Sequence, residues 1–265
     1  MNGGSGMATR GVAAITGAAQ GIGQSTALLL GELGFALALA DLRPCAETLA
    51  ILRRRGVEAL DHTGDLCDET VVTRFAATVR ERWGRADVLV NNAGVSFIAP
   101  AETVAAADFR RVLEVNLVAP FLLAKTFGAA MLERRSGSIV NVASIAGLTG
   151  IADRTAYNAS KHGLIGLTRT LAAEWGGRGV RCNAVCPGWV KTAMDDAAQG
   201  AGIYADADIT DRVPMARFAT PEDVARAIAF LADPAASGFV NGHTLVVDGG
   251  WTADGSWQSL RLAHR

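Results

Sequence analysis

The stretch Val12-Ala-Ala-Ile-Thr-Gly-Ala-Ala-Gln-Gly-Ile-Gly23 joins a short apolar run to a glycine-rich turn that opens a helical pattern. The run Val12–Ile15 predicts a buried strand. Glycines let the backbone behind it turn tightly and approach a pyrophosphate at the positive end of the following helix. The spacing is Gly-x-x-x-Gly-x-Gly, so Gly17, Gly21 and Gly23 predict either a dinucleotide-binding loop or a structural turn.

The same alternation of strand and helix continues along the chain. Further apolar, β-rich runs lie at Phe35–Ala40, Val57–Leu60, Val88–Val90, Ser138–Val142, Arg181–Val185 and Thr244–Val247. Helical patterns lie at Ile22–Leu33, Ala46–Arg55, Glu69–Trp83, Ala107–Arg134, Arg154–Trp175 and Pro221–Leu231. We therefore predict an α/β fold: a single-domain, Rossmann-type, doubly wound parallel sheet of about seven strands flanked by helices, with ligands beyond the carboxyl ends of the strands.

Length and composition fit one globular domain. The chain has 265 residues, of which 50% are hydrophobic and 19% charged, and its net charge is −1. A nearly neutral chain with scattered arginines has no general attraction for nucleic acid, so none is expected as a partner. We expect a flexible leader at 1–9, the Rossmann-type core at 10–251 with a flap at about 191–217, and a tail at 252–265.

Membrane and metal functions are not predicted. The most apolar stretch, Thr26–Ala40, is interrupted by Gly31, Glu32 and Gly34, so no spanning run is expected. Met1–Gly6 lacks the basic and apolar regions of a signal peptide. The four cysteines show no metal-ligand spacing, which favours reduced thiols in the cytoplasm and no bound metal.

Asp41 favours NAD over NADP. It follows the second predicted strand, 18 residues after Gly23 (41 − 23 = 18), close to the ~20 expected for an acid that binds the adenosine ribose. Its carboxylate would accept hydrogen bonds from both ribose hydroxyls and repel a 2′-phosphate, while Gln20 and Leu42 offer no positive charge. Arg43 could reach such a phosphate, so NADP remains the less favoured alternative.

Three side chains form a candidate reactive group. Tyr157 and Lys161 are four residues apart in a helical segment (161 − 157 = 4) and so project from one face. Alone, such a pair is usually a surface pair. Ser144 follows a predicted strand at the carboxyl edge, where its hydroxyl would hold a substrate oxygen against the tyrosine. A phenol beside an ammonium group is favoured as phenolate, which suits a general base.

Together these residues resemble the short-chain dehydrogenase/reductase family of the Tyr-x-x-x-Lys type, from about Arg10 to Gly250. The resemblance rests on Thr16-Gly-Ala-Ala-Gln-Gly-Ile-Gly23, Asp65-Leu-Cys-Asp68, Asn91-Asn-Ala-Gly94, Asn116, Ser144, Tyr157-Asn-Ala-Ser-Lys161, Pro187-Gly188 and Thr192. Leu171–Arg181 and Val247–Trp251 look like segments of members that act on polyols and sugars, but also of 3-oxoacyl carrier-protein reductases.

The resemblance implies a role for each matching residue. Ser144 would polarise the carbonyl or alcohol, Tyr157 would be the general acid/base, Lys161 would lower the pKa of the tyrosine, and Asn116 would support a water-linked proton path from Lys161. The nucleotide contacts would come from Gly17, Gln20, Gly21, Ile22, Gly23, Asp41, Asp65, Leu66, Asn92, Ala93, Gly94, Tyr157, Lys161, Pro187, Gly188, Val190 and Thr192. Several members are tetramers, so a homotetramer is expected.

The substrate side is predicted from topology alone. Ser96, Phe97, Asp153 and Trp189 are expected around the reacting carbon, where apolar walls and polar groups suit a polyol, a sugar, a hydroxy acid or a cyclic alcohol. The expected reaction is hydride transfer between NAD and a secondary alcohol or ketone. Two alternatives stay open: an NADPH-dependent reductase of 3-oxoacyl thioesters, and a catalytically silent NAD-binding sensor or scaffold on the same fold.

Overall fold

Seven parallel strands form one sheet in a computed structural model that describes residues 10–191 and 205–257. The strand order is β3-β2-β1-β4-β5-β6-β7, and each neighbouring pair is parallel. The strands are β1 (Gly11–Thr16), β2 (Phe35–Asp41), β3 (Ala59–Thr63), β4 (Val88–Asn91), β5 (Gly137–Val142), β6 (Val180–Pro187) and β7 (Thr244–Val247). The order reverses direction at β1 and β4, which makes the sheet doubly wound and confirms the predicted fold class.

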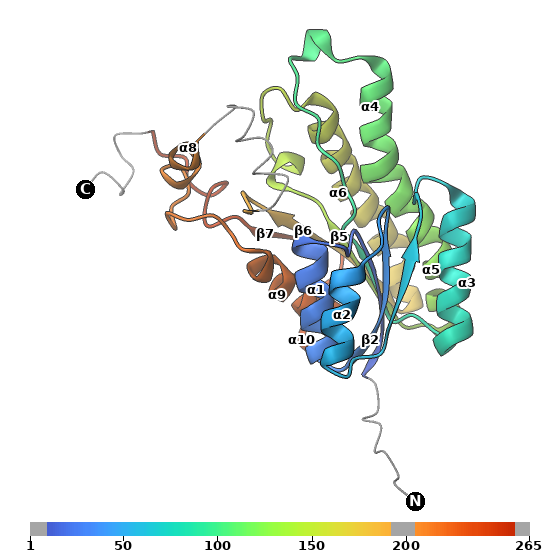
Figure 1. The fold of residues 1–265 in the computed structure, drawn as a ribbon. Coiled ribbons are helices and arrows are strands. Elements are labelled where there is room, and N and C mark those ends of the chain that lie inside the picture. The colour runs from blue at the N-terminus through green and yellow to red at the C-terminus, as the bar shows by residue number, and fades with distance from the viewer. Residues whose placement is uncertain (1–9, 192–204, 258–265) are drawn as a thin grey trace, which may run out of the picture.

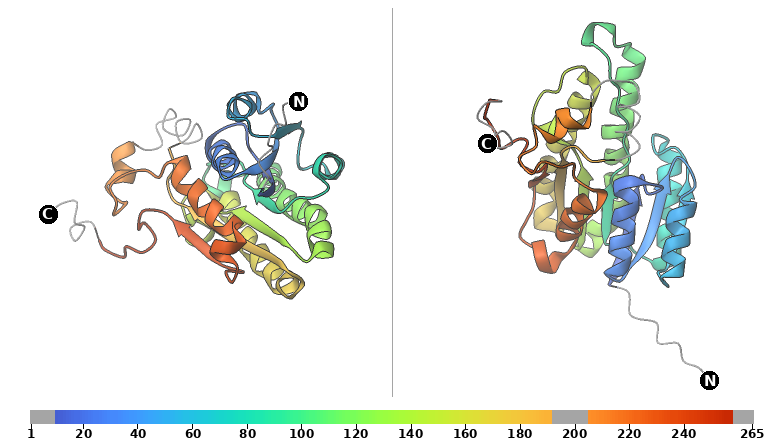
Figure 2. Two further views of the ribbon diagram at one scale, coloured as in Figure 1. Left: turned by 90° about the horizontal axis from the view of Figure 1, so that it is seen from below. Right: turned by 60° about the vertical axis from the view of Figure 1, so that its left-hand side comes forward.

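Helices cover both faces of the sheet (Figures 1 and 2). On one face, the alternate β1 residues Ala13 and Ile15 pack in a core with α1, α2 and α9; on the other, Val12 and Ala14 share a core with α3, α5 and the end of α6. The bounds are α1 (Gly21–Glu32), α2 (Ala46–Arg54), α9 (Pro221–Ala232), α3 (Glu69–Trp83), α5 (Ala119–Arg134) and α6 (Thr155–Trp175). Because β1 is buried on both faces, its sequence is apolar throughout instead of alternating.

Two predicted elements differ from the structure. Val57 precedes β3 because its N–H donates to Leu52 and closes the end of α2, where Gly56 has a φ of +71°. The pattern predicted as one helix over 107–134 consists of α4 (Ala106–Leu113), the π-helical turn η2 (Glu114–Val118) and α5. Such a turn widens the helix by one residue and often marks a functional position.

Short elements complete the chain: η1 (Ala101–Thr103), η3 (Ile145–Gly147), η4 (Gly176–Arg178), α8 (Asp206–Thr210) and α10 (Pro234–Ser237). The predicted flap at 191–217 falls partly outside the described residues, and its described part carries α8 and turns. The leader at 1–9 lies wholly outside them. The described part of the tail folds back on its own chain, because Asp254 accepts hydrogen bonds from Arg212.

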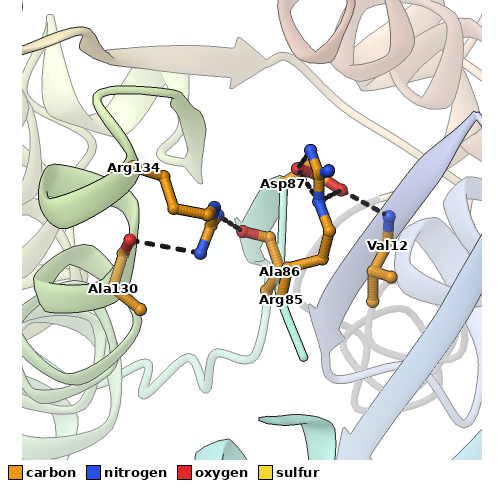
Figure 3. A network of polar contacts seen from close by, with 6 residues as sticks. All are labelled: Val12, Arg85, Ala86, Asp87, Ala130 and Arg134. Carbon is orange, nitrogen blue, oxygen red and sulfur yellow. Dashed lines mark hydrogen bonds and ion pairs between the residues drawn. The ribbon is translucent and has the colours of Figure 1, made fainter. Parts of the chain in front are cut away.

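Polar contacts fasten β1 and β4 at the edge of the sheet where these strands begin (Figure 3). A carboxylate oxygen of Asp87 accepts the N–H of Val12 at 2.9 Å, and the Nε of Arg85 donates to the same carboxylate at 2.8 and 3.0 Å. Arg134, at the end of α5, donates to the carbonyl of Ala86 at 2.6 Å. These bonds fix the two central strands relative to each other. The carboxyl ends of both strands, at the other edge of the sheet, therefore lie in a defined register.

The segment Ala106–Arg134 has the length and apolar character of a membrane span, with a mean hydropathy of 1.6 in its most apolar window. Within α5, however, Leu123, Phe127 and Met131 are buried in the core beside the sheet. Core packing therefore accounts for part of its apolar character.

Candidate active site

A cavity of about 1260 Å³ lies at the carboxyl edge of the sheet, between the segments that follow β1, β2, β4, β5 and β6. Most of the predicted site residues line it: Gly17, Gln20, Gly21, Ile22, Asp41, Asp65, Leu66, Asn92, Ala93, Gly94, Ser96, Ser144, Tyr157, Lys161, Pro187, Gly188, Trp189 and Val190. Gly23, Asn116, Phe97 and Asp153 are not among its lining residues, and Thr192 lies outside the described residues.

The glycines of the loop after β1 occupy positions that a side chain would disturb. Gly17 and Gly21 have φ values of +65° and +59°, which residues other than glycine rarely adopt. A Cβ atom on Gly23 would lie 2.1 Å from the carbonyl oxygen of Gly17 and 2.6 Å from the Nδ2 of Asn92. No side chain caps the N-terminus of α1. Its first N–H groups therefore remain for an anionic ligand such as a pyrophosphate, and the cradle fits a dinucleotide.

Thr16 and Asn92 tie this loop to the end of β4. The Oγ1 of Thr16 accepts the backbone N–H groups of Asn92 at 3.0 Å and of Ala93 at 3.1 Å. In return, the Nδ2 of Asn92 donates to the carbonyls of Thr16 at 3.0 Å and of Gly17 at 3.1 Å. The predicted turn at Asn91–Gly94 is thus a structural partner of the glycine loop as well as a wall of the cavity.

At one end of the cavity, two carboxylates are held by backbone N–H groups. Asp41 accepts hydrogen bonds from the N–H of Ala19 and of Arg43, both at 3.1 Å, so its carboxylate is oriented between the glycine loop and the start of α2. Asp65 accepts the N–H of Cys67 at 3.0 Å. Arg43 also lines the cavity here, which makes this end the place where the ribose substituents would be distinguished.

Asn116 lies behind the cavity wall, at the centre of the π-helical turn, and is fully buried. Its side chain exchanges two hydrogen bonds with the backbone of Val95, at 2.8 and 2.9 Å, and donates to the Oγ of Ser160 at 3.1 Å. The carbonyl of Asn116 receives no bond from the residue four positions on, because Pro120 has no N–H. Asn116 therefore joins the π-helical turn to α6 and to the loop after β4.

Ser144, Tyr157 and Lys161 converge on the cavity. Ser144 caps η3, and its Oγ accepts the N–H of Ala146 at 3.1 Å. Tyr157 and Lys161 project from successive turns of α6, and the Nζ of Lys161 lies 5.5 Å from the centre of the tyrosine ring. That Nζ donates to the carbonyl of Val142, the last residue of β5, at 2.8 Å. The three predicted side chains are thus brought together by β5 and α6.

The pKa values in this group are shifted by burial. Burial raises the pKa of the Tyr157 phenol, while a hydrogen bond with Ser144 and the positive charge of Arg154 act in the opposite direction. Burial lowers the pKa of Lys161 to about 8. The role expected of Lys161, lowering the pKa of the tyrosine, stays a prediction; its Nζ lies beside the tyrosine ring and donates to the carbonyl of Val142.

The substrate end differs from the prediction at two positions. Asp153 is exposed and has a φ of +59°; its carbonyl, rather than its side chain, holds the loop by accepting the N–H of Ala99 at 2.9 Å. Phe97 also does not line the cavity, whereas the neighbouring Ile98 does. At this end, the aliphatic side chains Ile98 and Ile151 line the cavity without having been predicted. The charged side chains Arg111 and Glu114, also not predicted, line it on the nucleotide side near Cys67. No motif marks these residues, because loop conformation and the approach of α4 place them there.

Arg154 and Trp189 form part of the wall at the substrate end. The guanidinium of Arg154 donates to the Oγ of Ser96 at 2.9 Å and lies 5.6 Å from the ring centre of Trp189. Behind this wall, the Trp189 ring lies 5.8 Å from that of Trp251, and Arg212 covers Trp251 at 4.9 Å. This row of side chains therefore runs from α6 to the C-terminal segment.

Fold and site together define a class of protein. A glycine cradle, a ribose-facing carboxylate and a Ser-Tyr-Lys group in one cavity are the parts of a nicotinamide-dependent oxidoreductase that acts on CH–OH groups. Residues 17–252 match a family model described as Enoyl-(Acyl carrier protein) reductase. The chain belongs to the short-chain dehydrogenase/reductase family, as its motifs indicate.

Relatives of known name support this assignment. The chain is 42% identical to the D-threitol dehydrogenase of Mycolicibacterium smegmatis over 91% of this chain and 92% of that protein. It is 43% identical to the cis-4-hydroxycyclohexanecarboxylate dehydrogenase of Sinomonas cyclohexanicum over 91% and 96%. A crystal structure of a candidate NAD(P)-dependent gluconate 5-dehydrogenase from Beutenbergia cavernae, with NADP at low occupancy, aligns with a TM-score of 0.87 at 42% identity, covering 93% of this chain and 98% of that one. The protein is thus an NAD(P)-dependent oxidoreductase of secondary alcohols.

The glycine cradle predicts a specific loss of nucleotide binding. In Gly23→Ala, the added Cβ meets the backbone of Gly17, so the loop must open and the affinity for NAD or NADP should fall by at least ~10-fold. Gly166→Ala on α6 is the control, because nothing lies within 4 Å of its Cβ position. Isothermal titration of both variants with both nucleotides measures the effect; equal affinities would contradict the tight-approach argument.

The reactive group predicts two separable effects. Tyr157→Phe should keep nucleotide binding and lower turnover by at least ~10²-fold, because the hydroxyl that transfers the proton is gone.

Ser144→Ala removes a bond that lowers the pKa of Tyr157, so the rising limb of the pH profile of kcat/KM for alcohol oxidation should move to higher pH.

The pH profiles of wild type and Ser144→Ala, measured with one alcohol and saturating nucleotide, check the second effect. A limb that stays in place while the rate falls would mean that Ser144 orients the substrate without influencing the ionisation of Tyr157.

Proposed function

We propose that the protein is an NAD-preferring dehydrogenase that oxidises a secondary alcohol of a small molecule, namely a polyol, sugar, hydroxy acid or cyclic alcohol. One observation carries the cofactor choice: the carboxylate of Asp41 is fixed at the cavity by two backbone N–H groups. A carboxylate held there favours two ribose hydroxyls and opposes a 2′-phosphate.

The residues divide the chemistry between them. A bound nicotinamide supplies the hydride acceptor for the alcohol or the hydride donor for the ketone. Ser144 donates a hydrogen bond to the substrate oxygen and holds it at the tyrosine. Tyr157, as phenolate, takes the hydroxyl proton during oxidation and returns it during reduction. Lys161 would hold the nicotinamide ribose, and Asn116 would support a water-linked path that leads protons from Lys161 to solvent.

A second function is supported by one residue. Arg43 lines the cavity beside Asp41, and the related structure from Beutenbergia cavernae contains NADP. A guanidinium that turned toward the ribose would offset the repulsion by Asp41. These observations favour NADP. The alternative is an NADPH-dependent reductase, and the motifs of this chain also resemble those of 3-oxoacyl thioester reductases.

Exchange of Asp41 distinguishes the two. In Asp41→Ser the negative charge is removed, so the ratio of kcat/KM with NAD to that with NADP should fall by about 10- to 100-fold relative to wild type. Arg43→Ala should change the ratio in the opposite direction, since it removes the cation next to the phosphate position. Steady-state kinetics with one alcohol and both nucleotides give both ratios. A wild type that prefers NADP and reduces 3-oxoacyl thioesters would favour the alternative.

We also propose a cytoplasmic homotetramer with no nucleic-acid or membrane partner. Exposed aromatic side chains support association: Phe121 on α5 is 45% exposed, and Phe239 before β7 is fully exposed. Four unpaired cysteines suit a reducing compartment. Light scattering on the purified protein should give four times the chain mass. A monomeric mass would contradict the assembly, because these aromatic side chains would then stay exposed to water.

A further inference from the structure

The two ends of the cavity differ in charge. Among its described lining residues the acids are Asp41, Asp65 and Glu114. Asp41 and Asp65 lie at the ribose end, and Glu114 acts electrostatically on Cys67, next to Asp65. All three carboxylates are thus on the nucleotide side. At the catalytic end, the cationic lining residue besides Lys161 is Arg154.

Arg154 is held in place by uncharged groups. It is the N-cap residue of α6, three residues before Tyr157. Its Nη1 donates to the hydroxyl of Ser96, and its guanidinium lies over the ring of Trp189. Within the described parts of the chain, no carboxylate forms an ion pair with it. A guanidinium has five N–H donors in a planar fork, so this arrangement leaves most of them for a planar anion.

The charge of Arg154 acts on the reacting group. Arg154 and Tyr157 are three residues apart at the start of α6 and line the same cavity. The positive charge of Arg154 opposes the rise in the pKa of Tyr157 that burial causes. An anionic group on a substrate would therefore lie close to the carbon that reacts, on the same side of the cavity as Tyr157.

Among the described residues, the remaining walls at this end are mainly apolar. Ile98, Ile145, Ile151 and Trp189 line the cavity there, and Ser96 supplies one hydroxyl. A polyol would place several of its hydroxyls against these aliphatic side chains, which is unfavourable. A hydrocarbon skeleton that carries one hydroxyl and one carboxylate matches both the walls and the cation.

On this basis, and resting on the proposed dehydrogenase function, we infer that Arg154 with Ser96 forms an anion subsite, and that the physiological substrate is a hydroxy acid whose carboxylate binds this guanidinium. Trp189 supports the guanidinium from one face, so the fork keeps its orientation when the carboxylate arrives. Among the classes of alcohol proposed above, this selects the one with a negative charge.

Matched substrates test the inference. 4-Hydroxycyclohexanecarboxylate, 3-hydroxybutanoate and gluconate would each be compared with the corresponding carboxamide, which has the same shape and no charge. Wild type should prefer the acids. Arg154→Gln should lower kcat/KM for the preferred acid by about 10- to 100-fold, mainly through KM, and reduce the acid-to-amide ratio accordingly. Arg154→Lys should retain part of that ratio because it keeps the charge but not the fork.

Arg169→Gln is the matched control, since Arg169 is exposed on the same helix and the substitution removes the same charge. It should leave the acid-to-amide ratio unchanged. Equal use of acids and amides by wild type, or an equal loss for both in Arg154→Gln, would overturn the anion subsite and leave the dehydrogenase function intact.

A binding measurement separates this inference from the proposed function. Cyclohexanecarboxylate and cyclohexanecarboxamide would be titrated against wild type and Arg154→Gln with NAD present, using calorimetry. Binding of the carboxylate but not of the carboxamide, lost in Arg154→Gln, supports the anion subsite whether or not any alcohol is turned over. Absence of turnover with every alcohol would count against the dehydrogenase proposal instead. Binding of neither compound, or of both equally, overturns it.

Discussion

The contact between Gly23 and the carbonyl of Gly17 is the constraint on which the nucleotide end of the molecule depends. Helix α1 begins so close to the loop behind β1 that a methyl group at Gly23 would overlap the backbone. The loop is closed from the other side by Asn92, whose amide bonds two of its carbonyls. Because Asn92 directly follows β4, the cradle exists only where β1 and β4 end in register. That register is fixed at the far edge of the sheet by Asp87 and Arg134.

Much of the fold could be predicted because each element has a local signal. Strands buried on both faces read as apolar runs, and the glycine loop, Asp41 and the Tyr-Lys pair stand at fixed distances from them. The π-helical turn at Asn116 was not predicted, since a widened turn keeps nearly the same apolar periodicity as an α-helix. Val57 was assigned to a strand because it is β-branched, whereas Gly56 directs it into the end of α2.

The substrate end was predicted less well, for a physical reason. Its residues come from loops whose conformation depends on contacts distant in sequence. Asp153 has the polarity expected of a substrate ligand, yet its left-handed backbone turns the side chain to solvent and uses the carbonyl to hold Ala99. Arg154, one residue later, is brought into the cavity by Ser96 and Trp189. The side chain of one residue thus faces solvent while that of the next lines the cavity, and the residue types alone do not predict this difference.

The row of side chains from Arg154 through Trp189 and Trp251 to Arg212 joins the pocket to the C-terminal segment, where Asp254 accepts hydrogen bonds from Arg212. The shape of the pocket therefore depends on residues that do not line it. Loss of the Asp254 carboxylate would release Arg212 from the ring of Trp251, and each side chain in the row would lose a neighbour that holds it in place. The position of the guanidinium at the reacting group is thus determined in part by a bond between Arg212 and Asp254, which are 42 residues apart in the chain.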